Sequence, residues 1–209
     1  MENQESKDFS VTKLVYKTIA GLSGGLGGGV VLMVLYVLAV GVTGDLGSVD
    51  PRPGLGAVIV GAVLLLIANI TGSMLSTFLF ALVEKAKYRD FGKALYQIAL
   101  LNLMVFILLV PVYLISNLAV DGALILIFIL QIVFTIQSSH LIFESVANPE
   151  GGVAGIYGTT IALLISTIVL VVLFAVINNP MIVLMLAFPV VWGAIGFSQS
   201  VISLIGSSK

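Results

Sequence analysis

The stretch 134–146, FTIQSSHLIFESV, holds the residues of this chain that come closest to a chemical constellation. It contains the only histidine, His140, and a carboxylate, Glu144, four residues later. Side chains at this spacing share one face of a helix and can pair. The pair predicts an interfacial contact that closes a helix near a membrane surface. With one histidine and no cysteine, the chain lacks the roughly four ligands of a transition-metal site, so we expect no metal and no cofactor.

A hydrolytic site is the sharper alternative, with Ser138 or Ser139 as nucleophile and His140 as base. Adjacent residues on a helix point about 100° apart, so neither serine can form such a pair with this neighbour. A serine from another helix could approach the imidazole, and a membrane enzyme that uses His140 and Glu144 stays an alternative. We expect a protein without catalytic activity and assign no catalytic residue.

Polar side chains gather toward one end of three apolar segments. The candidate set is Ser76, Thr77, Gln131, Gln137, Ser138, Ser139, His140, Glu144, Gln199 and Ser200. These residues predict either hydrogen bonds between helices or a polar pathway for neutral solutes or lipid. No Asp, Glu, Lys or Arg falls near the middle of a span, which argues against ion-driven transport.

Composition determines the class of protein. Of 209 residues, 59% are hydrophobic and 9% are charged, and the mean hydropathy is +1.21. Soluble domains carry about 25% charged residues. A net charge of −1 gives no support for binding to nucleic acid. The sequence predicts an all-α, polytopic protein whose surroundings are the lipid bilayer.

Charges, prolines and glycines divide the chain into six apolar segments, each near or above the roughly 20 residues that span a bilayer. Helices are expected because every backbone group must be satisfied internally in lipid. A polar segment, 1–17, is expected to precede a transmembrane domain, 18–209. The expected helices cover about 18–43, 55–83, 94–118, 122–147, 153–178 and 180–205.

The distribution of Lys and Arg predicts the orientation. With six spans, eight of the nine basic residues fall on one side, and only Arg52 lies on the other. The positive-inside rule then places both termini in the cytoplasm. The compactness of the chain favours a prokaryotic plasma membrane.

An internal repeat is one interpretation of three successive hairpins. A shift of 62 residues aligns Ser76, Ser138 and Ser200, and also Gln137 with Gln199. The other matches are Leu, Ile and Val in a chain rich in them. Three related helical hairpins and three unrelated hairpins of similar length both fit this pattern.

Glycine gives the clearest packing signal. Gly21, Gly25 and Gly29 recur every four residues in the first segment, and Gly61 and Gly72 belong to similar small-residue spacings in the second. Such strips let helices approach closely, within one chain or between chains. Self-association through the first helix, or contact with other membrane subunits, is therefore expected. The predicted function is an accessory or assembly component of a membrane complex, or a membrane organiser; the alternative is a small channel or facilitator.

Overall fold

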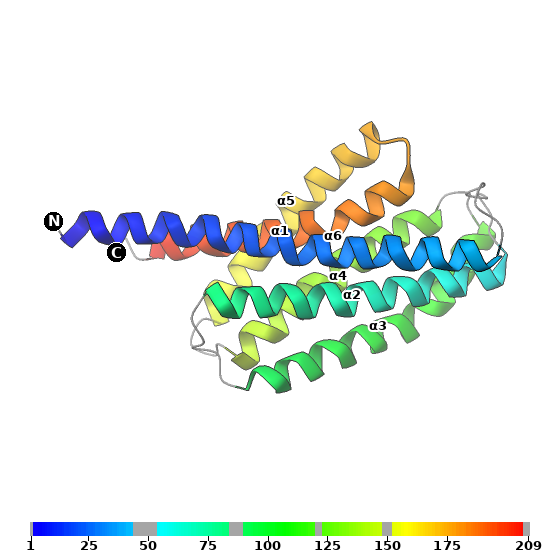
Figure 1. Cartoon of the computed structure of the whole chain (residues 1–209), viewed down its shortest axis with the longest axis horizontal. Coiled ribbons are helices and arrows are strands. Elements are labelled where there is room, and N and C mark those ends of the chain that lie inside the picture. The colour runs from blue at the N-terminus through cyan, green and yellow to red at the C-terminus, as the bar shows by residue number, and fades with distance from the viewer. Residues whose placement is uncertain (1, 44–53, 84–89, 120–122, 148–151, 207–209) are drawn as a thin grey trace.

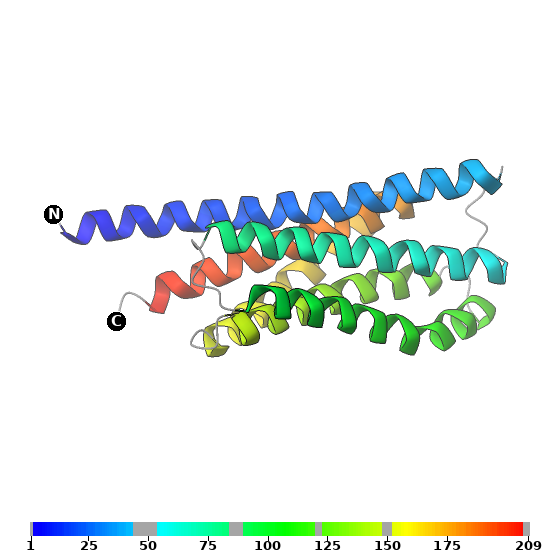
Figure 2. The same ribbon diagram turned by 60° about the horizontal axis from the view of Figure 1, so that its bottom comes forward.

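The computed structural model describes residues 2–43, 54–83, 90–119, 123–147 and 152–206. In this part of the chain the regular structure is entirely helical, which confirms the all-α expectation. The helices are α1 (Glu2–Thr43), α2 (Leu55–Val83), α3 (Phe91–Ala119), α4 (Ala123–Ala147), α5 (Gly152–Val176) and α6 (Pro180–Gly206). Successive helices run in opposite directions, and both termini lie at one end of the bundle (Figures 1 and 2). We call this the terminal end and the opposite one the far end.

All six helices contain a stretch long and apolar enough to cross a membrane. The fold is therefore that of an integral, multi-pass membrane protein. The expected polar segment 1–17 continues directly into the first span, because α1 begins at Glu2 and its apolar part covers Val11–Val40. At 1.5 Å per residue its 42 residues measure about 63 Å, roughly twice the hydrocarbon thickness of a bilayer.

One row of glycines on α1 packs against α6. A Cβ added at Gly25 would lie 2.5 Å from the Cα of Pro189, and one at Gly29 would lie 2.6 Å from the backbone oxygen of Met185. Gly21 meets the backbone of Trp192 in the same way. Pro189 cannot donate a helix hydrogen bond to the Met185 oxygen, so the missing side chain at Gly29 lets α1 cover a carbonyl that proline leaves free.

A second row of glycines on the neighbouring face of α1 packs against α2. Gly24 lies against Ser76, and a Cβ at Gly28 would lie 3.0 Å from the Cα of Gly72. Each glycine inside a helix costs roughly 0.5–1 kcal/mol relative to alanine. Close backbone packing on two faces offsets that penalty. Helix α1 is thus wedged between α2 and α6 of its own chain.

Helix α4 occupies the centre of the remaining bundle and contacts α2, α3, α5 and α6 (Figure 2). Its parallel neighbour α2 approaches it at Gly61, whose added Cβ would lie 3.6 Å from Phe128. Ile132 and Ile136 of α4 are fully buried, as are Phe188 and Val191 of α6. Most polar residues of α4 consequently face other helices, on several sides, and are buried.

Substitution of Gly25 by alanine should lower the stability of the bundle. The new methyl group would meet backbone atoms of Phe188 and Pro189, which cannot rotate away, and overpacking of this kind costs about 1–3 kcal/mol. Gly56→Ala is the matched control, since an added Cβ there has no heavy atom within 4 Å. Thermal loss of helical circular dichroism in detergent measures the effect. A melting midpoint for Gly25→Ala equal to that of Gly56→Ala would contradict the packing.

Candidate functional site

Lys17 of α1 is an inward-facing charge near the terminal end. It lies four residues before Gly21, so it continues the glycine row that faces α6, and only 6% of it is exposed. Its ammonium nitrogen donates a hydrogen bond to Oε1 of Gln199 at 3.0 Å. The sequence analysis counted Lys17 as a flanking cytoplasmic charge. Because α1 begins at Glu2 and has no side chains at the glycines above Lys17, α6 instead packs over this residue.

Gln199 links Lys17 to the histidine of α4. Its Nε2 lies 2.5 Å from Nε2 of His140, which is fully buried. The same imidazole nitrogen is 3.9 Å from Oε1 of Glu144, a side chain that is 5% exposed. We call Lys17, His140, Glu144 and Gln199 the buried polar cluster.

Two glycines of α5 allow that helix to cover the cluster. A Cβ at Gly158 would lie 3.0 Å from Cγ of Gln199, and one at Gly155 would lie 3.4 Å from Cβ of Glu144. The His140–Glu144 pair was expected at a helix end near the membrane surface. The structure instead encloses it, since α5 and α6 pack over the last turns of α4.

The charge on Lys17 determines which way the other groups of the cluster are oriented. An ammonium has only donors, so the Gln199 oxygen must face it and the Gln199 amide nitrogen must face His140. The amide then donates to Nε2 of the imidazole, which leaves the imidazole proton on Nδ1 in the neutral form. A cation on α1 therefore selects one tautomer of a histidine on α4.

Three aromatic rings meet beside the cluster. Phe80 of α2, His140 of α4 and Trp192 of α6 are each at most 1% exposed. Their centroids are separated by 5.7 Å for Phe80–Trp192, 6.1 Å for Phe80–His140 and 6.1 Å for His140–Trp192. We call this group the ring triangle. It ties three helices together with edge-to-face contacts of the kind that aromatic pairs prefer.

A polar stripe on α2 leads away from the ring triangle toward mid-membrane. It consists of Asn69, Ser73 and Ser76, which are all completely buried. The same helix face continues to Phe80. Within the part of the chain that the structure describes, both amide atoms of Asn69 and the hydroxyls of both serines have no protein hydrogen-bond partner. Trp192 Nε1 and His140 Nδ1 share this property.

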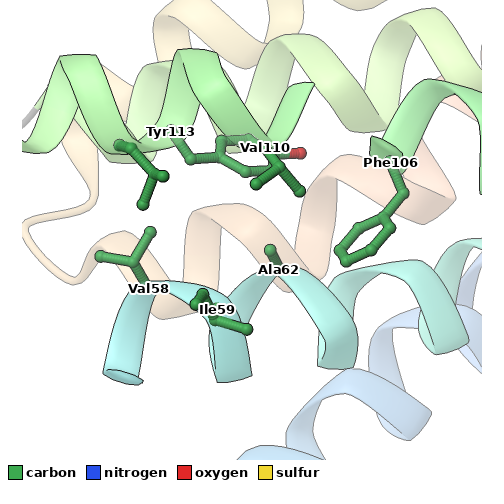
Figure 3. A pocket seen from close by; sticks show the side chains of 7 residues that line it. Val58, Ile59, Ala62, Phe106, Val110 and Tyr113 are labelled. Atoms are coloured by element: carbon green, nitrogen blue, oxygen red, sulfur yellow. The ribbon is translucent and has the colours of Figure 1, made fainter. Parts of the chain in front are cut away.

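The same face of α2 changes character in the far half of the bundle. There it carries Val58, Ala62 and Leu65, all buried. A cavity of about 90 Å³ opens between α2 and α3, lined by residues such as Val58, Ala62, Phe106 and Val110 (Figure 3). Its walls are apolar, so it suits a hydrocarbon group. The polar part of this face of α2 therefore belongs to the terminal half.

The other candidate residues are divided among several contacts. Tyr113 of α3 donates its hydroxyl to Oε1 of Gln131, and Asn102 of α3 donates to the hydroxyl of Ser139 at 3.2 Å. The remaining ones do not join the cluster: Thr77 and Ser200 bond backbone oxygens of their own helices, Ser138 is half-buried, and Gln137 is buried with both amide atoms unpartnered among the described residues.

The equivalent serines of the 62-residue shift also differ in surroundings. Ser76 lies against Gly24, whereas Ser200 bonds the backbone oxygen of Gly196 at 2.8 Å. The hairpin repeat therefore stays a prediction from the sequence.

Across the described ranges, no three or more residues of the types His, Cys, Asp and Glu come together as metal ligands. The chain matches no protein-family model, and neither the curated proteins nor the solved structures contain a match to it. The geometry of the cluster and of the stripe therefore carries the functional argument.

Five residues of this region were absent from the sequence-based candidate set: Lys17, Asn69, Ser73, Phe80 and Trp192. For Lys17 a signal existed, because its spacing from Gly21 and Gly25 places it on the glycine face. Asn69 lies seven residues before Ser76 and Phe80 lies four residues after it, and both spacings indicate one helix face. No spacing within α6 indicated that Trp192 would meet the histidine.

Lys17→Met should lower the stability of the protein by about 1–3 kcal/mol, because the buried Gln199 oxygen would lose its charged donor. Lys93→Met, at an exposed position in the first turn of α3, should change stability by less than about 0.5 kcal/mol. Thermal midpoints in detergent compare the two. Equal midpoints would show that the Lys17–Gln199 bond contributes nothing to the fold.

Proposed function

We propose that this protein is a non-catalytic facilitator that admits small neutral polar solutes into the membrane interior. The pathway starts at the buried polar cluster and continues past the ring triangle along the polar stripe of α2. With both termini in the cytoplasm, as the basic residues predict, the polar half of the bundle faces the cytoplasm.

One observation carries the proposal: among the described residues, buried polar atoms without protein hydrogen-bond partners follow one face of α2. The atoms are those of Asn69, Ser73 and Ser76, and they continue to His140 Nδ1 and Trp192 Nε1. A polar group without a partner costs several kcal/mol in hydrocarbon, so sequences retain such groups where water or a polar solute meets them. Because the stripe is made of amides and hydroxyls, it suits neutral solutes such as water, polyols or amides.

In this proposal the structure corresponds to a closed state of the facilitator. The ring triangle separates the cluster from the stripe, and the apolar face formed by Val58, Ala62 and Leu65 follows the stripe on the far side. Passage requires α6 to move relative to α2 and α4. Pro189 interrupts the hydrogen bonds of α6 near its middle and gives that helix a place to bend.

The two other functions expected from the sequence have less support. An accessory role was inferred from the glycines of the first helix, but these pack against α2 and α6 of the same chain and no longer argue for a partner. A membrane enzyme would need a nucleophile beside His140. Its Nε2 instead faces Gln199, while Ser139 pairs with Asn102.

Asn69→Leu tests the pathway. It replaces an unpartnered buried amide by an apolar group of similar size, so it should preserve or raise stability while it lowers solute flux severalfold. Stopped-flow light scattering of proteoliposomes under gradients of water, urea and glycerol measures the flux.

Asn102→Leu is the matched control, since it makes the same change at a buried amide whose nitrogen bonds Ile98 O and Ser139. It should reduce stability and leave flux unchanged. The proposal fails if purified wild-type protein gives no flux above empty liposomes for any of these solutes. It also fails if both variants reduce flux equally.

A further inference from the structure

The imidazole Nε2 of His140 lies between two competing partners. The Gln199 amide nitrogen is 2.5 Å away and the Glu144 carboxylate oxygen is 3.9 Å away. Gln199 offers a donor in the orientation that Lys17 imposes, whereas a carboxylate offers only acceptors. The first partner therefore suits a nitrogen with a lone pair, and the second suits a nitrogen with a proton.

We propose that His140 is a proton-binding site whose occupancy decides whether α4 is linked to α1 through Gln199 and Lys17. In the neutral state the bonds run from the Lys17 ammonium to the Gln199 oxygen, and from the Gln199 amide to Nε2 of His140. In the protonated state the imidazolium N–H at Nε2 turns to the Glu144 oxygen. The regulatory consequence depends on the proposed function, but the proton site itself does not.

Protonation breaks the link because Gln199 cannot serve both partners. A proton from water takes the lone pair of Nε2, and two N–H groups then face each other across 2.5 Å. If the amide stays, His140 must swing toward Glu144; if the amide turns, its oxygen accepts from His140 and its nitrogen faces the Lys17 ammonium. Turning removes the Lys17–Gln199 bond, and swinging removes the Gln199–His140 bond. Either change breaks the chain of hydrogen bonds that joins α4 to α1.

Among the residues that the structure describes, the charged groups joined to His140 are Lys17 from α1, through Gln199, and Glu144 from its own helix. The neighbouring helices present uncharged groups, namely Phe80 from α2, Gly155 and Gly158 from α5, and Trp192 and Gln199 from α6. Of the charged groups that the structure describes at this site, Lys17 opposes a gained proton and Glu144 favours it, so the protonation of His140 responds to both side chains.

The position of the cluster ties proton binding to solute entry. Lys17 and Gln199 hold α1 and α6 together at the terminal end, and Trp192 on α6 packs against the same histidine. A proton on His140 therefore loosens the entrance to the polar stripe. This predicts faster solute entry when the side of the membrane at the terminal end is acidic.

The chain supplies its own reporter for this site. It has one tryptophan and one histidine, and their ring centroids are 6.1 Å apart. An imidazolium quenches indole fluorescence more strongly than a neutral imidazole does. The emission of Trp192 in nanodiscs should therefore fall in one sigmoidal step on acidification, within the pH range in which the protein stays folded.

Variants assign the step to the cluster. His140→Phe keeps a ring against Trp192 and should abolish the step. Lys17→Met removes the opposing cation and should move the midpoint up by about one pH unit, while Glu144→Gln should move it down by a similar amount. Gln199→Leu removes the donor to the neutral imidazole and should also raise the midpoint. Monodisperse size exclusion and unchanged helical ellipticity identify the variants that remain folded.

A second measurement needs no variant. Histidine-selective nitrogen-15 labelling gives signals from His140 alone, since no other histidine exists. At alkaline pH it should show the tautomer protonated on Nδ1, and acidification should convert it to the form protonated on both nitrogens. A proton on Nε2 at alkaline pH, or no conversion across the range in which the protein stays folded, overturns the proposal.

The proton site and the facilitator can fail independently. Fluorescence and nitrogen-15 signals that follow the expected course, without solute flux in liposomes, would keep the switch and reject the transport function. Flux that Asn69→Leu reduces, together with a fluorescence step that Lys17→Met and Glu144→Gln leave in place, would keep transport and overturn the switch.

Discussion

The close approach of α1 to two other helices is the constraint on which the rest of the interior depends. In a bilayer, apolar side chains gain little by leaving lipid for protein, so helix association relies on van der Waals contact and hydrogen bonds. Two adjacent rows of glycine bring the backbone of α1 against α6 at Gly25 and against α2 at Gly28. A single helix is thus held on two faces by backbone contact. This wedge fixes the relative positions of α2 and α6, neither of which needs extensive contact with the other.

The same wedge determines where a charge enters the bundle. Lys17 continues the row of Gly21 and Gly25, and it points at α6 because the glycines do. A buried ammonium is costly unless it is paired, and Gln199 supplies an oxygen for it. The amide of Gln199 then donates to His140, whose Nε2 also lies near the carboxylate of Glu144. A packing interaction made without side chains therefore controls the chemistry of three residues on two other helices.

Polar side chains project from helix α4 in several directions. Gln131 and Ser139 face α3, whereas His140 faces α6 and approaches α2 through Phe80. The polar stripe of α2 and the buried polar cluster lie in the terminal half, and the same face of α2 is apolar beyond them. A face of α2 that is polar on one side of mid-membrane and apolar on the other suits a protein that binds from one side and is closed to the other. That asymmetry is the physical basis of the proposed transport role.

The fold class followed from local properties of the sequence. Apolar length and the need to satisfy backbone groups in lipid act within each segment, so six spans could be placed before any contact was known. Contacts between faces could not be predicted in this way. These helices are apolar nearly all round, so the periodicity that separates a buried face from an exposed one in soluble helices is weak here. His140, Glu144 and Gln199 could be named as polar residues in an apolar chain, but nothing within their own segments indicated that Lys17 would join them.

What the sequence alone determined was the class of the protein, its number of helices and the close packing of the first one, because length, hydrophobicity and glycine spacing are encoded locally. The tertiary structure decided which helices those glycines meet, and it also turned a flanking lysine into an interior one. It further converted a helix-end pair into a buried cluster and aligned the polar stripe of α2 with the ring triangle. These features depend on how α1, α4 and α6 are placed side by side, and in a membrane that placement is decided by steric fit and donor–acceptor matching between distant segments.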